Sequence, residues 1–255
     1  PKLICSWMYH SIFISIFIKK FINKKNIWLI RHGNFNKKYS KKTTLLLKNI
    51  IKKFSKFSNE IIYCSHSSKQ IHTKYGFSNL NAKVIVNGVD TNKFKFNKKF
   101  KKKLKEEFKI SEDYFVIGMV GRYHPQKNHE QLFRVLNREE IREIKIAIVL
   151  IGKNIKKIKS KIMNQNKKHK FYFINERHDI HKFYSLFDLY LSTSSFGESF
   201  PNVLIESMAC KIPTIASDLS DNKRILNNKK MIFNINDDKD LASKIMSVIN
   251  LYNKK

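Results

Sequence analysis

The sequence predicts an α/β protein of two domains, each with a parallel sheet flanked by helices. Segments typical of strands alternate with segments typical of helices along the chain. Some strands, above all 115–120, are continuous apolar runs of the kind found in sheets buried on both faces. Glycine and polar residues follow the strands, where α/β proteins bind ligands. We therefore expect doubly wound sheets with a binding site at their carboxyl edges.

The first domain is expected over residues 1–83. Its opening stretch, 1–23, is apolar but short for a membrane span and lacks a small-residue cleavage site. This favours a buried helix, starting near Trp7, over a signal or an anchor. The rest of the domain is expected to contain strands 27–31 and 61–64 and helices 41–57 and 65–75.

The second domain is expected over residues 84–236. Strand 84–86 leads into a turn and a lysine-rich segment that ends at Lys105, which we interpret as a linker. Residues 237–255 are expected to form a closing helix with acidic residues in its first turn, where the helix dipole favours them. The remaining elements are expected as strands 115–120, 144–151, 171–174, 189–192, 214–217 and 231–234 and helices 129–136 and 180–186, with one more helix near Pro201.

The chain is strongly basic. Its 255 residues carry a formal charge of +31, while a hydrophobic fraction of 42% is that of a globular protein. Such a surface attracts nucleic acid, anionic lipid and phosphorylated substrates. The lysines are dispersed among isoleucines and asparagines, so the charge is equally consistent with a bias in codon composition.

Cysteines and histidines do not form a recognisable metal or disulfide pattern. Cys5, Cys64 and Cys210 lie far apart, which favours a reduced, cytoplasmic protein. The spacing of four histidines is irregular, and we expect no metal; they are His124, His129, His178 and His181. His10 lies in an apolar run, where a buried structural histidine with a polar partner is the ordinary interpretation.

The segment GESFPNVLIESMACKIP, residues 197–213, is the first candidate site. Glu198 lies in a glycine-containing loop, and Glu206 lies within the helix that Pro201 is suited to begin. The start of a helix can receive a phosphate, and carboxylates accept hydrogen bonds from sugar hydroxyls. The segment therefore indicates a nucleotide-sugar site. The alternative is an ordinary amphipathic helix with two solvated glutamates.

Two cations follow strand 115–120 and form the second candidate site. Arg122, directly after Gly121, can donate two hydrogen bonds to a diphosphate, and Lys127 adds a point charge. Both would stabilise the charge of a leaving diphosphate. The alternative is that both are solvated surface residues of a basic chain.

Three segments in the same order resemble retaining glycosyltransferases of family 4, which have the GT-B fold. They are VIVNGVDTNKF at 84–94, GMVGRYHPQKNHEQL at 118–132 and SSFGESFPNVLIESMACKIPTIASD at 194–218. WMYHS and WLIRHGN resemble the later part of that family's N-terminal domain. The resemblance implies two Rossmann-like domains, the N-terminal one incomplete, and a closing helix that crosses back to the N-terminal domain.

The resemblance also implies roles for individual residues. Arg122 and Lys127 would hold the donor diphosphate, with Gly121 allowing close approach. Glu198 would bind hydroxyls of the transferred sugar and Glu206 the ribose. The remaining implied residues are Ser199, Phe200 and Pro201, with backbone groups near the phosphate and sugar, and His10, over the reacting sugar.

The implied reaction moves a sugar from a nucleotide-diphosphate sugar to an acceptor hydroxyl, with retention and without a cofactor or bound metal. We expect a glycan or lipid-linked acceptor in bacterial cell-surface polysaccharide, lipopolysaccharide or capsule biosynthesis. The expected location is cytoplasmic, with an anionic membrane surface as a peripheral partner.

Some features depart from the family pattern. Lys211 replaces a glycine, and Lys223 and Arg224 stand where an acidic residue is common. The opening strand and glycine-rich loop of the family are not found before Trp7. The alternative function is therefore an impaired remnant that binds nucleotide or polyanions without turnover. Nucleic-acid binding is indicated by charge alone, without a recognised motif, and is not expected.

Overall fold

The structure is a computed structural model that describes residues 2–22, 24–33, 42–162 and 168–254. Its contacts divide the chain into two compact units. One unit contains residues 1–87 and 196–200, and the other contains residues 88–195 and 201–255.

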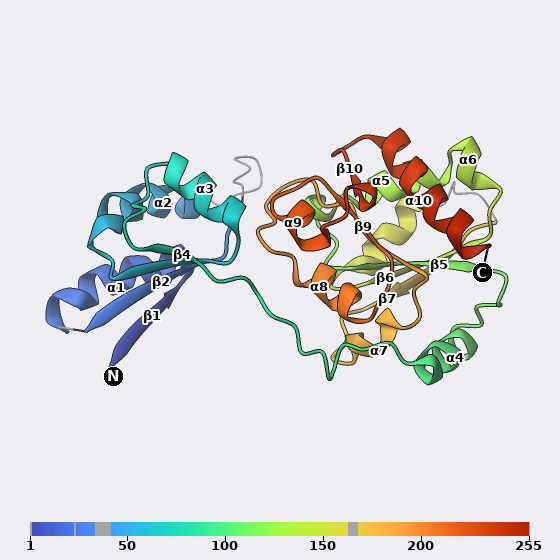
Figure 1. The fold of residues 1–255 in the computed structure, drawn as a ribbon, viewed down its shortest axis with the longest axis horizontal. Helices are drawn as coiled ribbons and strands as arrows, with labels where there is room; N and C mark the ends of the chain where they lie inside the picture. The colour runs from blue at the N-terminus through green and yellow to red at the C-terminus, as the bar shows by residue number, and fades with distance from the viewer. Residues whose placement is uncertain (1, 23, 34–41, 163–167, 255) are drawn as a thin grey trace. The chain divides into compact units, whose positions relative to one another are not determined.

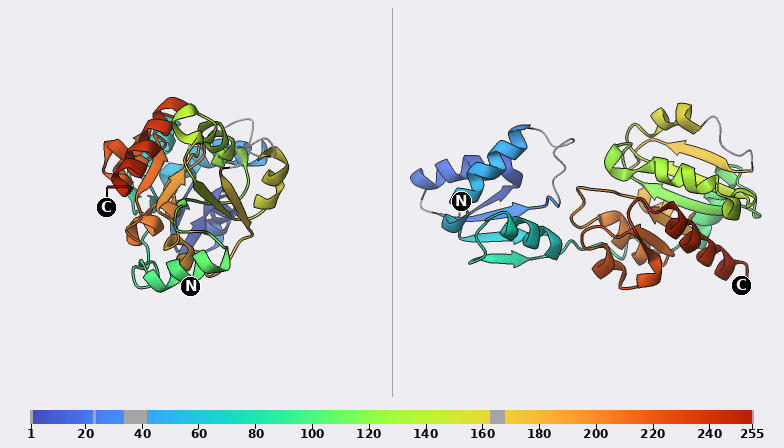
Figure 2. Two further views of the ribbon diagram at one scale, coloured as in Figure 1. Left: turned by 90° about the vertical axis from the view of Figure 1, so that its right-hand side faces the viewer. Right: turned by 90° about the horizontal axis from the view of Figure 1, so that it is seen from above.

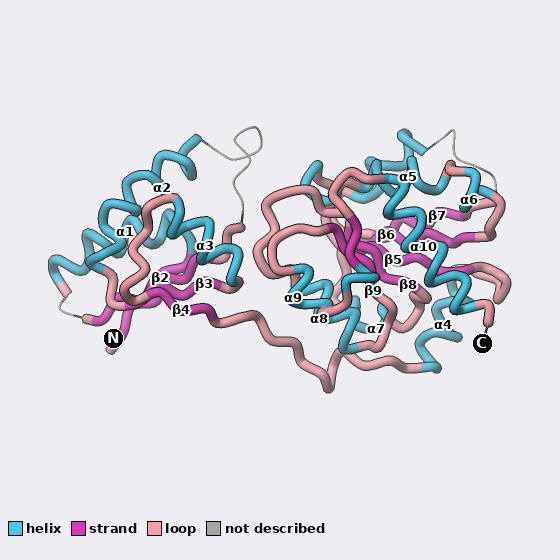
Figure 3. The backbone as a smooth tube through the Cα atoms, turned by 45° about the horizontal axis from the view of Figure 1, so that its top comes forward, coloured by secondary structure: helices cyan, strands magenta, loops and turns pink. Residues whose placement is uncertain are grey.

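The first unit is a four-stranded parallel sheet with helices on one face (Figures 1 and 3). The strands lie in the order β1 (Leu3–Trp7), β2 (Lys25–Ile30), β3 (Glu60–Tyr63) and β4 (Ala82–Val84). The helices are α1 (Met8–Phe21), α2 (Lys42–Phe54) and α3 (His66–Lys74). Between helices and sheet lies a core of Tyr9, Ile12, Trp28, Ile30, Ile51, Ile61, Tyr63 and Phe77.

The helix predicted to start near Trp7 is α1, but the expectation of no strand before it was wrong. Residues Leu3–Trp7 form strand β1, which pairs in parallel with β2 from Leu3 opposite Lys25 to Trp7 opposite Leu29. A short apolar run has no periodicity that separates strand from helix. The chain then turns at Met8, whose φ of 64° is left-handed, into α1.

The second unit is a six-stranded, fully parallel sheet. Its strand order is β10 (Ile232–Phe233), β9 (Thr214–Ser217), β8 (Leu189–Ser192), β5 (Phe115–Val120), β6 (Ile146–Ile151) and β7 (Lys170–Ile174). Strands β5 to β7 follow one another towards one edge of the sheet, and strands β8 to β10 follow one another towards the other edge. The direction in which successive strands are added therefore reverses between β5 and β8. Ligands of doubly wound sheets bind at such a point.

Helices cover both faces of the second sheet (Figure 2). On one face lie α5 (His129–Leu136), α6 (Glu139–Arg142), α10 (Asp238–Tyr252) and the 3-10 helix Ile155–Ile162. On the other face lie α4 (Lys98–Glu107), α7 (Ile180–Tyr184), α8 (Asn202–Ala209) and α9 (Asn222–Leu226). The predicted class of two parallel-sheet α/β domains is thus confirmed.

Part of the predicted linker is helical. Helix α4 lies within the lysine-rich segment, and the Asn97 side chain caps it by accepting from the Lys99 backbone N–H at 2.9 Å. Leu104 is buried in the core of this unit. The run of lysines concealed the spacing of Phe100, Leu104 and Phe108, which is that of a helix with one apolar face.

Helix α10 packs against α5 and α6 within the second unit. Its predicted crossing to the other domain stays a prediction. None of the helices in the described ranges is long and apolar enough to cross a membrane.

Candidate functional site

The exits of β5 and β8 lie side by side, because these strands pair in parallel through Ile117 opposite Leu189 and Gly118 opposite Tyr190. Beyond β5 the chain continues into Gly121, Arg122 and the loop to Lys127, and beyond β8 it continues into Thr193 and Ser194. The order of the strands therefore brings the second candidate site to the point between β5 and β8 where the direction of strand addition reverses.

Two glycines allow the backbones beyond β5 and β6 to approach closely. Gly121 has a φ of 156° and Gly152 a φ of 151°. A Cβ atom on Gly152 would lie 2.2 Å from the Gly121 carbonyl oxygen, and one on Gly121 would lie 3.0 Å from Lys127 Cε. Only glycine fits where these two loops cross. Because glycine has no side chain, the backbone of both loops stays accessible beside the cations.

Hydrogen bonds hold the loop that contains the cations. His124 Nδ1 accepts from the Gln126 backbone N–H at 3.2 Å and caps a short 3-10 helix, Pro125–Lys127. The Thr193 hydroxyl donates to the Lys127 carbonyl at 2.8 Å and also lies 3.0 Å from the Asn128 carbonyl. The two loops are therefore linked. Thr193, directly after β8, holds the backbone of Lys127 in the loop beyond β5.

The site is electropositive. Arg122 is exposed and Lys127 is half-buried beside Gly121. Burial and the charge of Arg122 both lower the pKa of His124, which favours the neutral imidazole. A cavity of about 10 Å³ is lined by Lys127, His129 and Thr193, among others. It is about large enough for one water molecule.

His129 is a buried, neutral base behind Lys127. It is 1% exposed, and burial lowers its pKa to about 4. Its Nδ1 atom has no hydrogen-bond partner in the part of the chain that the structure describes. The low pKa keeps a second positive charge from forming next to Lys127 at neutral pH.

Helix α8 begins without a side-chain cap from the described residues. Pro201 is its N-cap, so it precedes the first turn instead of occupying it as predicted. No side chain caps α8, and its first turn contains no acidic residue. The start of this helix can therefore accept an anion.

Glu206 lies on α8 and is half-buried. Its Oε2 accepts a hydrogen bond from the Tyr184 hydroxyl at 2.6 Å. Burial raises the pKa of Glu206, while the bond from Tyr184 acts in the opposite direction. The carboxylate is oriented by Tyr184 and suited to accept from a ligand hydroxyl.

The predicted residues fall into both units. Gly121, Arg122 and Lys127 lie in the second unit, on the loop beyond β5, and Pro201 and Glu206 lie in the same unit at and within α8. The other four lie in the first unit, and their convergence with these stays a prediction: His10, Glu198, Ser199 and Phe200. His10 is exposed on α1, so its interpretation as a buried structural histidine was wrong.

Three residues that position the site were missed in the sequence. Thr193 ties the two loops, Gly152 permits their approach, and Tyr184 orients Glu206. Thr193 belongs to a run of hydroxyl residues directly after a buried strand, a signal that could have been used. The pairing of Tyr184 with Glu206 depends on the packing of α7 against α8 and has no signal in the sequence.

Among the described residues, no group of three or more histidines, cysteines, aspartates or glutamates is placed to hold a metal ion. The three cysteines are unpaired by disulfides.

Two family models match the chain. Residues 100–255 match the model of glycosyl transferases group 1. Residues 1–93 match the model of glycosyltransferase family 4.

One curated relative is the protein EpsF of Bacillus subtilis strain 168, whose name assigns it to the glycosyltransferases. The two are 30% identical over 149 residues, which is 56% of this chain. The matched part spans only 38% of the length of EpsF.

Solved structures share the fold. HepE of Anabaena, in a complex with UDP-glucose, is 20% identical with a TM-score of 0.85, over 99% of this chain and 70% of HepE. A glycosyltransferase of Rickettsia africae ESF-5 is 17% identical with a TM-score of 0.70, over 99% of this chain and 89% of its own. At these identities the likeness concerns the GT-B fold.

Proposed function

Since the chain belongs to the glycosyl transferases of group 1, we propose that it transfers a sugar from a nucleotide-diphosphate sugar to an acceptor hydroxyl. The observation that carries the proposal is the loop beyond β5. There Lys127 is fixed by Thr193 and lies against Gly121, at the point where ligands of a doubly wound sheet bind. The binding of UDP-glucose and UDP by HepE supports a nucleotide-sugar donor.

In the proposed reaction, the bond between the anomeric carbon and the diphosphate oxygen breaks. The electron pair leaves with the diphosphate, and the acceptor oxygen bonds to the same carbon, with retention of configuration. The acceptor proton passes to the departing phosphate or to solvent. Negative charge develops on the leaving group, so Arg122 and Lys127 would stabilise the transition state more than the ground state.

The remaining residues would bind and orient the donor. Glu206, held by Tyr184, would accept from the ribose hydroxyls, and the start of α8 after Pro201 would lie near the phosphates. Glu198 would accept from hydroxyls of the transferred sugar, with Ser199 and Phe200 beside it. His10, exposed on α1, would lie over the reacting sugar.

The charge of the diphosphate would be balanced by side-chain cations, so the proposed chemistry uses no resident cofactor. The acceptor we propose is a glycan or a lipid-linked sugar, in the biosynthesis of a bacterial cell-surface polysaccharide. The proposed location is the cytoplasm, at the inner face of the membrane.

Turnover tests this proposal directly. The chain is incubated with UDP-, GDP- and ADP-sugars, and nucleotide release and sugar transfer are measured for the wild type, Glu198→Ala and Lys127→Ala. Turnover with one donor, lost in both variants, is expected. Nucleotide binding without any turnover would instead support the impaired remnant, and neither binding nor turnover would contradict both.

A further inference from the structure

The segment 91–105, TNKFKFNKKFKKKLK, is the most basic part of the second unit. It contains eight lysines, three phenylalanines, no arginine and no acidic residue. Most of it forms α4, and two of its lysines, Lys98 and Lys99, lie in the first turn of that helix. Positive charge there opposes the helix dipole. The lysines of this helix therefore lower its own stability.

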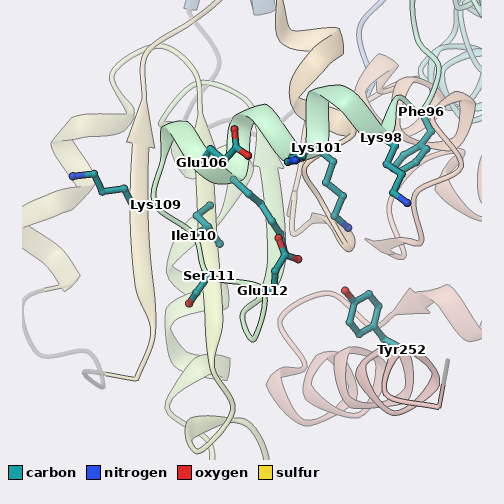
Figure 4. A pocket seen from close by; sticks show the side chains of 11 residues that line it. Phe96, Lys98, Lys101, Glu106, Lys109, Ile110, Ser111, Glu112 and Tyr252 are labelled. Atoms are coloured by element: carbon teal, nitrogen blue, oxygen red, sulfur yellow. The ribbon is translucent and has the colours of Figure 1, made fainter.

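Helix α4 forms one wall of a groove of about 930 Å³, which also contains Tyr252 of α10 (Figure 4). Five lysines line the groove: Lys98, Lys101, Lys102 and Lys105 at helical spacing on α4, and Lys109 just after the helix. The lining also contains Phe96 and two glutamates, Glu106 and Glu112. Cations thus outnumber carboxylates in the wall.

The lysines of α4 have two different functions. Lys101 pairs with the buried Asp188 at 2.6 Å, and Lys105 pairs with Glu112 at 2.7 Å. These two hold the helix to its unit. Lys98, Lys99, Lys102 and Lys103 are exposed and present their charges to solvent.

Apolar side chains lie at the same groove. Phe96 is 45% exposed and Tyr252 is 42% exposed, and both line the groove. Exposed lysines combined with exposed aromatic side chains are typical of a surface that lies in the headgroup region of a bilayer.

We propose that this lysine groove, defined by the residues that line it and the exposed lysines of α4, binds the surface of an anionic phospholipid bilayer. Clusters of four to eight basic residues on a helix bind anionic lipid, each contributing about fivefold to the affinity. Phe96 and Tyr252 would insert among the lipid headgroups. A soluble phosphate would leave the exposed rings of Phe96 and Tyr252 without a partner, which favours lipid.

This proposal deepens the membrane location proposed above and rests on it, because it names the surface that would hold the chain there. Binding to vesicles needs no donor and no acceptor, so the two proposals can fail separately.

The test is sedimentation of the full chain with two kinds of vesicle, phosphatidylcholine alone and phosphatidylcholine mixed with phosphatidylglycerol. The test variant is Lys98→Gln/Lys99→Gln/Lys102→Gln, which leaves Lys101 and Lys105 in place. The matched control is Lys156→Gln/Lys157→Gln/Lys159→Gln, which removes three exposed lysines from the 3-10 helix Ile155–Ile162 of the same unit. A third variant is Phe96→Ser, and urea unfolding verifies that each variant is folded.

The proposal predicts binding to the mixed vesicles only. The α4 variant should lose roughly a hundredfold in partition coefficient, and the control variant only a few fold. Phe96→Ser should lower the partition coefficient about tenfold. Added salt should change this loss less than the loss in the lysine variant, because salt screens charges and not apolar contacts. Equal losses in the two lysine variants would show that net charge alone binds lipid and would overturn the proposal. Failure to bind mixed vesicles would overturn it as well. Polyuridylate serves as a nucleic-acid probe, and a hundredfold loss of its binding in the α4 variant, with no loss of vesicle binding, would also overturn the proposal.

Discussion

The Tyr184 hydroxyl donates to Glu206 Oε2 at 2.6 Å and so joins α7 to the carboxylate proposed to bind ribose. Burial raises the pKa of Glu206, and this hydrogen bond lowers it. The hydrogen bond from Tyr184 thus favours the ionised form of Glu206, which accepts hydrogen bonds.

Replacing Tyr184 by Phe should weaken the binding of UDP about tenfold, since it removes one hydrogen bond to a charged group. The pKa of Glu206 should rise further in the variant. Binding that needs ionised Glu206 should therefore decline at a higher pH than in the wild type as the pH falls. Calorimetric titration with UDP over a range of pH measures both effects. An unchanged affinity and pH profile would contradict the assigned role of Tyr184.

Gly152→Ala should destabilise the second unit by at least about 2 kcal/mol. Its φ of 151° is rare for residues with a side chain, and a Cβ would lie 2.2 Å from the Gly121 carbonyl oxygen. Gly88→Ala is the matched control, because a Cβ there meets nothing within 4 Å. Urea unfolding of both variants measures the difference. Equal stability would show that the two loops are not held in contact.

Acid should destabilise the protein through His129. Burial lowers its pKa to about 4, so folding favours the neutral form. Its contribution to stability is complete above the ordinary pKa of about 6.5 and is lost as the pH falls towards 4, by on the order of 3 kcal/mol. His72 in the first unit, whose pKa burial also lowers to about 4, should add a second loss.

The free energy of unfolding, measured at about pH 7 and about pH 4 for the wild type and His129→Leu, tests this contribution. The variant should lose less stability between the two conditions. An identical loss would mean that His129 does not titrate with folding.

Lys101 and Lys102 are neighbours that should differ sharply in their effect on stability. Lys101 pairs with Asp188, whose side chain is 1% exposed and also accepts from the Val116 backbone N–H at 2.9 Å. Lys101→Met would leave a buried carboxylate without its cation and should cost about 3 kcal/mol or more. Lys102→Met removes an exposed charge and should change stability by about 0.5 kcal/mol at most. Similar effects in urea unfolding would contradict the division of α4 into anchoring and surface lysines.

Most of the second sheet could be predicted because its strands are buried on both faces and read as continuous apolar runs. Strand β6 is an example, with all six residues from Ile146 to Ile151 buried. Strands β5 and β8, which pair at the centre of the sheet, could be predicted for the same reason, and with them the position of Arg122 and Lys127. The rule that ligands bind at strand exits then required no knowledge of side-chain packing.

Strand β1 and helix α4 could not be predicted because their local signals were ambiguous. The apolar run at Leu3–Trp7 is compatible with strand or helix until β2 supplies its hydrogen-bond partners. In α4 the lysines outnumber the residues that mark its apolar face. The Tyr184–Glu206 bond depends on tertiary contacts between helices and lies beyond any local pattern.

The central claim is that the loop beyond β5 binds the diphosphate of a nucleotide sugar, and calorimetric titration with UDP tests it most directly. Lys127→Ala should weaken binding at least about tenfold, because it removes a cation held beside the phosphates. Lys156→Ala removes an equal charge from the 3-10 helix of the same unit and should leave binding unchanged. Equal affinity of the wild type and both variants for UDP, or loss of the same size in both variants, would contradict the account.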